Sequence, residues 1–342
     1  MRKHLKTMAL VILTLLILWR LWRGLDWTEV LHSLGQASIL LLLASLVVSA
    51  ATNLVRAFRW RTLLSPLTPT ELHPVFAAIN IGIGGSFIFG TAAGELIRPL
   101  VLPLLNPQVR RTTAFLTIIV ERIFDLSVLC MLFGLGLLWF PFIGYQPSVK
   151  AHVSEIGVVL LALPPLALST LLLFRGRFIS RSNRLIELTD REQPNHGRIR
   201  RAASRFLRQL LGALSVLTNA KELVVVILWT AVQWLSVILA NWLILRAFDL
   251  GFGFKETVLV MCFGLAGSFV PTPGGAAGAF HAALSGGLVL MGVALEKAAA
   301  ISITAHLIGF IPALAFGSYF LLRRGISLAQ LQREMSIVAE TR

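Results

Sequence analysis

Five charged residues stand inside otherwise apolar stretches and are the strongest candidates for chemistry: Glu95, Arg98, Glu121, Arg122 and Asp125. The first two are three positions apart and the two later acids four apart, so each pair would share one face of a helix. A charge in hydrocarbon costs on the order of a few kcal/mol or more. We therefore expect Arg98 to join both later acids in a buried network, serving either structural pairing or a charged substrate. An ordinary hydrated cluster at the membrane surface is the alternative.

Three further arginines, Arg56, Arg59 and Arg61, follow an apolar run. A guanidinium group matches the oxygen atoms of a phosphate bidentately, so these side chains are candidates for phosphate recognition. Simple anchoring at the membrane surface is the favoured explanation, and phosphate recognition comes second.

A helix-breaking motif, Pro271, Pro273, Gly274 and Gly275, interrupts a later apolar stretch. Backbone N–H groups freed at such a turn can bind an anion, although a plain structural hairpin is an equal alternative. His281 follows and could titrate near neutral pH, but a lone histidine on an apolar segment is more often a hydrogen-bonded filler.

Nothing in the sequence indicates a catalytic or metal centre. The loops contain no DxD, HxxxH or SxxK arrangement, and Cys130 and Cys262 stand singly in apolar stretches without metal-ligand spacing. We therefore predict no catalytic residue, no metal ion, no cofactor and no enzymatic activity.

The elements that must position these residues are membrane helices. The chain has 342 residues, of which 56% are hydrophobic and 14% charged, and its mean hydropathy is +0.80. A spanning helix needs about 20 apolar residues, and several runs qualify: 39–55, 156–174, 223–245 and 298–322. The composition predicts an all-α polytopic membrane protein with a single membrane domain over 1–342.

The net charge of +15 arises from basic clusters beside apolar runs, and no recognisable nucleic-acid-binding module accompanies them. Such clusters favour the cytoplasmic side. They predict about six full spans with both termini inside, and a cytoplasmic basic amphipathic segment at 175–221. The basic residues that flank the run 8–19 favour an uncleaved first helix over a signal peptide. The spans would cover 5–22, 38–57, 112–140, 153–174, 222–247 and 298–322.

Two apolar stretches, 74–105 and 257–291, are left outside these spans, and glycines interrupt both. Each leg would have about 10 to 15 residues, which at about 1.5 Å per residue falls short of the roughly 30 Å hydrocarbon core. We therefore expect re-entrant hairpins enclosed by other helices. Two short tilted spans in each stretch are the alternative.

The two halves of the chain repeat one another. Gly85-Ser86-Phe87 recurs as Gly267-Ser268-Phe269, and Ala92-Ala93-Gly94 recurs as Ala276-Ala277-Gly278. Upstream, Asn53 precedes an Arg-Ala-Phe triplet, as does Asn241. The predicted spans give the copies 38–140 and 222–322 opposite orientations, which is a recurring architecture of transporters.

Four patches together resemble the transmembrane, flippase-like domain of lysylphosphatidylglycerol synthases: RAFRWRTLL at 56–64, GELIRPLVL at 94–102, ERIFDL at 121–126 and FVPTPGGAAGAFHAAL at 269–284. The resemblance implies translocation of a phospholipid or lipid-linked headgroup. Those synthases also carry a soluble aminoacyltransferase domain after the membrane part, and we expect no such activity here. The sequence departs from the family at His281, where we expect an acidic residue.

The sequence thus predicts flipping or scrambling of a lipid in the cytoplasmic membrane of a bacterium or archaeon. A small-solute transporter and a membrane-embedded lipid-modifying enzyme are the alternatives. The expected partner is an anionic phospholipid or lipid-linked substrate, without nucleic acid, and formation of a homo-oligomer is left open. The predicted substrate-binding residues are Arg56, Arg59, Arg61, Glu95, Arg98, Glu121, Arg122, Asp125, Pro273, Gly274, Gly275 and His281.

Overall fold

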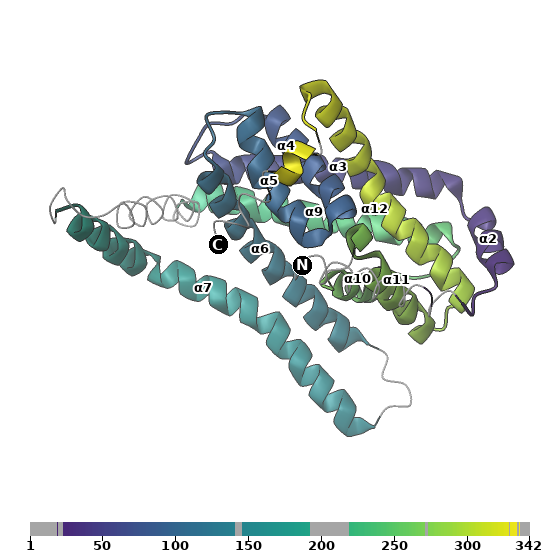
Figure 1. Ribbon diagram of the computed structural model, residues 1–342. Coiled ribbons are helices and arrows are strands. Elements are labelled where there is room, and N and C mark those ends of the chain that lie inside the picture. Colours follow the sequence, from purple (N-terminus) through teal and green to yellow (C-terminus); the bar gives the residue numbers. More distant parts are fainter. Residues whose placement is uncertain are drawn as a thin grey trace, which may run out of the picture.

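The computed structural model describes residues 19, 23–140, 146–191, 219–270, 273–327, 329–333 and 335. Every element in these ranges is a helix (Figure 1). The helices are α2 (Trp27–Gln36), α3 (Ile39–Leu64), α4 (Leu72–Phe89), α5 (Thr91–Leu105), α6 (Arg111–Trp139), α7 (Pro147–Arg191), α9 (Ala220–Ala247), α10 (Phe254–Ser268), α11 (Pro273–Leu290) and α12 (Leu295–Arg324).

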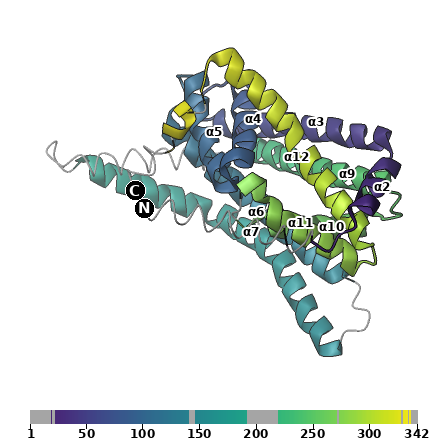
Figure 2. The same cartoon turned by 45° about the vertical axis from the view of Figure 1, so that its right-hand side comes forward.

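Five of the described helices are long and apolar enough to cross a membrane: α3, α4, residues 147–167 of α7, α9 and α12. The chain is therefore a multi-pass membrane protein. The predicted span 112–140 coincides with α6, which is not one of these five helices and contains Glu121, Arg122 and Asp125. The predicted span 5–22 and most of the basic segment 175–221 lie outside the described residues. Figures 1 and 2 both show α7 running out beyond the other helices.

Helices α3 and α9 pack side by side in opposite directions. The Ser45 hydroxyl donates to the carbonyl of Ala240 at 2.8 Å. Further along α3, the ring of Phe58 stacks on that of Trp229 at 5.0 Å. The position on α9 falls as the position on α3 rises, so these two equivalent helices of the proposed repeat are antiparallel.

The first glycine-rich stretch forms a hairpin of α4 and α5, with its turn at Gly90. This residue has a φ of +90°, which glycine adopts without the penalty of a side chain. The two legs touch through Gly94, where a Cβ atom would lie 1.7 Å from the Ser86 hydroxyl oxygen. Small residues allow such close approach of helix backbones.

The second stretch forms a hairpin of α10 and α11. A Cβ atom on Gly267 would lie 2.4 Å from the carbonyl oxygen of Ala279, so the glycine permits the contact between the legs. At the start of α11, Gly274, Gly275 and Ala276 all have left-handed φ values of 64° to 68°.

Two of the four hairpin legs are longer than expected. Helices α5 and α10 have 15 residues each, within the predicted range, but α4 and α11 have 18. In α4 the glycines at 82, 84 and 85 do not end the helix, because they serve as packing surface inside it.

The contacts between the first hairpin and α12 show which part of α12 the hairpin follows. Near the start of α4, the His73 ring meets that of Phe320 at 5.2 Å, close to the C-terminal end of α12. Near the end of α4, the Phe87 ring lies 6.0 Å from that of His306, close to the middle of α12. The first hairpin therefore follows only the C-terminal half of α12.

The second hairpin follows the other half of α12. The Ser285 hydroxyl donates to the carbonyl of Ala298 at 3.3 Å, near the N-terminal end of α12. At the start of α11, the Gly274 carbonyl accepts from Nε2 of His306 at 3.0 Å. His306 therefore lies beside the tips of both hairpins.

Six residues beyond His306, α12 contains Pro312. A proline has no N–H group, so the carbonyl four residues earlier, that of Ile308, loses its helical donor. The hydroxyl of Ser49 on α3 donates to this carbonyl at 2.9 Å. The interruption in α12 is therefore satisfied by a neighbouring helix.

Two buried apolar clusters mark opposite ends of the bundle. One joins the loops around 65–71, 106–110 and 325–327 through residues such as Leu64, Leu102, Val109, Phe320 and Leu331. The other joins α2 to the loops 248–253 and 291–294 through Val30, Phe248, Leu288 and Val293. We name them the basic end and the acidic end. The basic end carries Arg61, Arg110, Arg111, Lys221, Arg323, Arg324 and Arg333 against Glu71 and Glu222, and the acidic end carries Asp26, Glu29, Asp249, Glu256 and Glu296 against Arg23, Arg246, Lys255 and Lys297.

Candidate functional site: a buried ion network beside a cavity

The centre of the site is a set of bidentate ion pairs between three helices. Both terminal nitrogens of Arg98 on α5 bind the Glu121 carboxylate on α6, at 3.0 and 2.9 Å. Arg59 on α3 binds Asp125 at 2.6 and 3.0 Å and also reaches Glu121 at 3.0 Å. All four side chains are buried. The network expected for Arg98 is therefore present, with Arg59 bridging Glu121 to Asp125.

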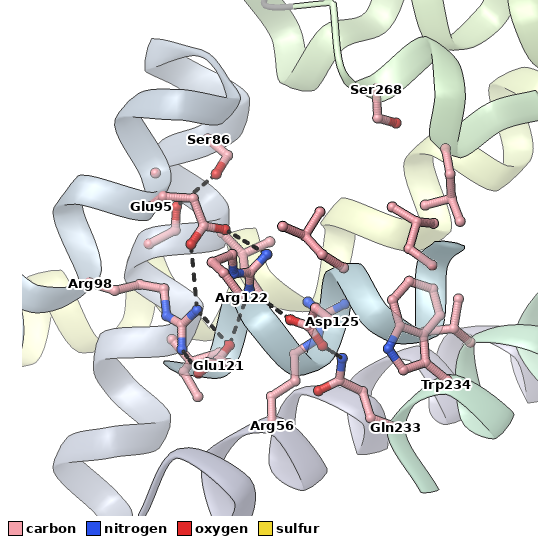
Figure 3. Close-up of a pocket in the computed structure, with 18 of the residues that line it drawn as sticks. Arg56, Ser86, Glu95, Arg98, Glu121, Arg122, Asp125, Gln233, Trp234 and Ser268 are labelled. Carbon is pink, nitrogen blue, oxygen red and sulfur yellow. Dashed lines mark hydrogen bonds and ion pairs between the residues drawn. The ribbon is translucent and has the colours of Figure 1, made fainter. Parts of the chain in front are cut away.

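Two half-exposed residues extend this network toward open space (Figure 3). Arg122 binds Glu121 at 3.1 Å and Asp125 at 3.0 Å. Its other terminal nitrogen lies 3.6 Å from Glu95, which is also 3.8 Å from Arg98. Glu95 closes the network onto the first hairpin.

Arg56 adds a positive charge that the network does not balance. Together with Arg56 the cluster has four arginines, at positions 56, 59, 98 and 122, against three acids, at 95, 121 and 125. Its formal charge is therefore +1. Within the described residues Arg56 has no hydrogen bond or ion pair, and Figure 3 places it beside Asp125 and Gln233.

Apart from Arg59, the charged side chains of this cluster border a partly open cavity of about 380 Å³. Both hairpins contribute to its wall, the first through Ser86 and Gly94 and the second through Ser268 and Phe269. Its polar lining comes from Arg56, Ser86, Glu95, Arg98, Glu121, Arg122, Asp125, Gln233 and Ser268, and apolar residues of α4, α6, α9 and α10 complete it.

Several buried polar atoms at the cavity have no partner. They include Nε1 of Trp234, Oε1 of Gln233 and Nε of Arg122. An unsatisfied buried donor or acceptor costs about 1–3 kcal/mol. A ligand with both oxygen acceptors and hydroxyl or N–H donors would satisfy these atoms.

Local packing holds Arg98 in place. A Cβ atom on Gly82 of α4 would lie 2.2 Å from Cγ of Arg98, so only glycine leaves room for this side chain. The guanidinium lies 4.6 Å from the ring of Trp60, whose Nε1 donates to Thr117 at 3.0 Å. The arginine is thus supported by α3, α4 and α6 together.

Other predicted site residues lie outside this cavity. Nε of Arg61 donates to the carbonyl of Thr70 at 2.9 Å, at the basic end. Gly275 packs against Phe310, whose ring a Cβ atom would approach within 2.5 Å. Gly274 accepts from His306 as described above, and the side chain of Pro273 lies outside the described residues.

His281 is buried between α11 and α12, apart from the ion network. Because the Ser302 hydroxyl already donates to Ala299, it must accept from Nδ1 of His281 at 3.2 Å. The rings of His281 and His306 are 4.9 Å apart. This arrangement links the second hairpin to the middle of α12 and places neither ring in the cavity lining.

Gln233, Trp234 and Ser268 also line the cavity and were not predicted from the sequence. A glutamine within the apolar run 223–245 was the available indication, because a buried amide needs a polar partner. Gln233 lies 3.5 Å from Asp125 through its amide nitrogen. Nothing in the sequence alone showed which side of α9 would meet α6.

Among the described residues, no cluster of three or more His, Cys, Asp or Glu is arranged to hold a metal ion. The fold and the site together define a multi-pass helical membrane protein with an ion network buried beside a cavity between two helical hairpins. The chain belongs to the family described as the lysylphosphatidylglycerol synthase TM region, whose model matches residues 7–317. This match confirms the resemblance found in the four sequence patches. No curated protein and no solved structure matches the chain.

Proposed function

We propose that the protein moves a lipid with an anionic headgroup between the two leaflets of a membrane. The observation that carries this proposal is the surplus charge of +1 beside a cavity inside a membrane protein. Within the described residues, Arg56 is the arginine of this cluster that has no ion-pair partner. A monoanionic phosphate would neutralise the surplus. The family membership supports a lipid-related role for the same site.

The hairpins give the headgroup a route across the bilayer. We infer that α4–α5 and α10–α11 are re-entrant hairpins of an inverted repeat that spans 38–140 and 222–322. Three observations support this: α3 and α9 are antiparallel, the hairpins follow opposite halves of α12, and both tips border one cavity. Irregular backbone at membrane depth is tolerated where it borders such a cavity.

The orientation follows from the charges at the two ends. We propose that the basic end faces the cytoplasm and that both termini lie on that side, in the cytoplasmic membrane of a bacterium or archaeon. Basic loops favour the cytoplasmic side of the membrane. The first hairpin would then enter from the cytoplasmic face and the second from the opposite face.

The test is translocation by the purified protein in vesicles that contain an acyl-labelled anionic phospholipid. The vesicles should show protein-dependent exchange of the label between leaflets. Arg56→Gln should slow exchange about tenfold or more, because a charge-assisted hydrogen bond contributes about 1.5–3 kcal/mol. Arg110→Gln, which changes an exposed arginine at the basic end, is the matched control and should exchange lipid at the wild-type rate.

The same vesicles separate the rival functions. Chemical conversion of the labelled lipid would replace the proposal with a membrane-embedded enzyme. Uptake of a soluble anion without lipid exchange would replace it with a small-solute transporter. Equal exchange rates for Arg56→Gln and the wild type would show that Arg56 does not bind the headgroup.

A further inference from the structure

A second, smaller polar cavity lies next to the first one and plays no part in the ion network. It has a volume of about 120 Å³ and is lined by α3, α9 and α12. Arg56 and Val237 line both cavities. On α3 the second cavity continues from Arg56 back to Ser49, and on α9 it continues from Val237 to Ile244. The two cavities therefore follow one another along the antiparallel pair α3–α9, and Arg56 stands where they join.

Arg56 is the charged residue in the described lining of the second cavity. The other polar side chains there are uncharged and belong to Ser49, Thr52, Asn53 and Asn241. None of the described residues that line it is acidic. The cavity therefore differs from the first one, where three carboxylates take part.

Hydrogen bonds determine how the side-chain amides of Asn53 and Asn241 are oriented in the second cavity. Asn80 donates from its amide nitrogen to the Phe76 carbonyl, so its oxygen must accept from the amide nitrogen of Asn53 at 3.0 Å. The amide nitrogen of Asn241 donates to the Val237 carbonyl at 2.9 Å. In both asparagines the nitrogen is therefore engaged, and the side-chain oxygen has no partner within the described residues.

Free amide oxygens accept hydrogen bonds and cannot donate them. Together with the lone pairs of the two hydroxyl groups, they suit a ligand group that carries several O–H donors. A cationic ammonium group would find no carboxylate here. A cavity of this volume has room for several water molecules, which suits a short polyol.

We infer that this cavity binds the uncharged, hydroxyl-bearing end of a phosphodiester headgroup whose phosphate lies at Arg56. This inference rests on the proposed function and narrows its substrate class to lipids with a neutral polyol headgroup. Each asparagine precedes the Arg-Ala-Phe triplet of its own repeat, Asn53 by three positions and Asn241 by five. The cavity therefore belongs to the interface between the repeats, where transporters of this architecture bind their substrates.

The test compares two acyl-labelled lipids in vesicles that contain the full-length protein: phosphatidylglycerol and phosphatidylpropanol. Both carry one phosphodiester charge and a three-carbon headgroup, but the second has no hydroxyl group. The wild type should exchange phosphatidylglycerol about three- to tenfold faster, which is the effect of one or two net hydrogen bonds. Asn241→Leu should remove this preference by slowing phosphatidylglycerol alone.

A second variant fills the cavity without changing its polar groups. Gly309 of α12 lines the cavity, and a Cβ atom there would meet no atom within 4 Å. Gly309→Leu should therefore fold normally and abolish the preference by occupying the space. Ser236→Ala removes a hydroxyl group on α9 that lines neither cavity and should keep the wild-type ratio.

Each outcome decides the inference. If the wild type exchanges both lipids equally, or if Gly309→Leu keeps the wild-type ratio, the headgroup does not bind here, although lipid translocation itself stands. If neither lipid exchanges, the proposed function is wrong and this inference falls with it.

Discussion

Glu121 is the residue on which the ion network depends. Its carboxylate binds Arg59, Arg98 and Arg122 at 2.9 to 3.1 Å and is almost completely buried. Two of these arginines are buried as well. A buried carboxylate shared by three guanidinium groups holds α3, α5 and α6 together through charge, where most membrane helices rely on small residues and van der Waals packing.

We predict that Glu121→Gln lowers the free energy of unfolding in detergent micelles by about 3–5 kcal/mol, because it leaves buried guanidinium groups uncompensated. Arg98→Gln in the same chain should restore a large part of this loss, since it removes one of those charges. Glu29→Gln, at an exposed position of α2, is the control and should have little effect. If the two single losses simply add in the double variant, within about 0.5 kcal/mol, Arg98 and Glu121 are not coupled.

The sequence was sufficient to predict one network of Arg98 with Glu121 and Asp125, because these charges stand in apolar stretches and an unpaired charge there is costly. It was insufficient for Arg59. Arginines at 56, 59 and 61 follow an apolar run, and anchoring at the membrane surface accounts for such a cluster without any pairing. In the structure these three differ completely: one is free at a cavity, one is buried in the network and one binds the Thr70 carbonyl. That difference depends on which face of α3 meets α6.

At the scale of the elements, glycines decide how closely the hairpin legs pack. Gly85 and Gly267 are equivalent positions of the proposed repeat, and both lie at contacts within a hairpin. A Cβ atom on Gly85 would lie 2.4 Å from Cδ1 of Ile97, whereas one on Gly267 would lie 2.4 Å from the carbonyl oxygen of Ala279. The first clash is with the end of a side chain, which can move. The second is with backbone, which cannot move without separating the legs.

We expect Gly267→Ala to destabilise the second hairpin by about 1–3 kcal/mol through this backbone clash. Gly84→Ala is the matched control, because its Cβ atom would make ordinary contact at 3.5 Å with the Ala313 carbonyl oxygen. That change should be neutral or should stabilise the helix by up to about 1 kcal/mol. Unfolding midpoints of the two variants in the same micelles provide the comparison. Equal midpoints would show that α10 and α11 do not pack as closely as the structure indicates.

Two helices in each glycine-rich stretch were predictable from the sequence, whereas the lengths of these helices were not. Gly82, Gly84 and Gly85 suggested a break in the middle of the first stretch, yet α4 continues through all three. A glycine ends a helix where its φ is positive, as at Gly90, and continues it where a neighbouring helix needs the space of its missing side chain. A single sequence does not distinguish these two uses.

At the scale of the whole molecule, basic and acidic loops from distant parts of the chain gather at opposite ends. The apolar clusters at these ends contain residues of α3, α5 and α12 on one side and residues of α2, α9 and α11 on the other. This separation is the basis for the orientation proposed above.

The orientation predicts which introduced cysteines an impermeant thiol reagent can reach in intact cells. The native cysteines are first replaced by Cys130→Ala and Cys262→Ala. Gln36→Cys at the acidic end should then react from outside, and Ser327→Cys at the basic end should react only after the membrane is opened. Both side chains are exposed, so access to the side chain itself is matched. The opposite labelling pattern would show that the orientation is reversed.

The interruption of α12 at Pro312 is a point at which the two halves of this helix can bend relative to one another. The first hairpin packs against α12 on the C-terminal side of His306, and the second packs against it on the N-terminal side. Just past His306, where the two attachments meet, the helix lacks the hydrogen bond to the Ile308 carbonyl, which Ser49 satisfies from α3. Proline is a common cause of helix bending. A change in the bend angle of α12 at Pro312 would therefore tilt one hairpin relative to the other. The wall of the cavity would then open at one end of the bundle as it closed at the other.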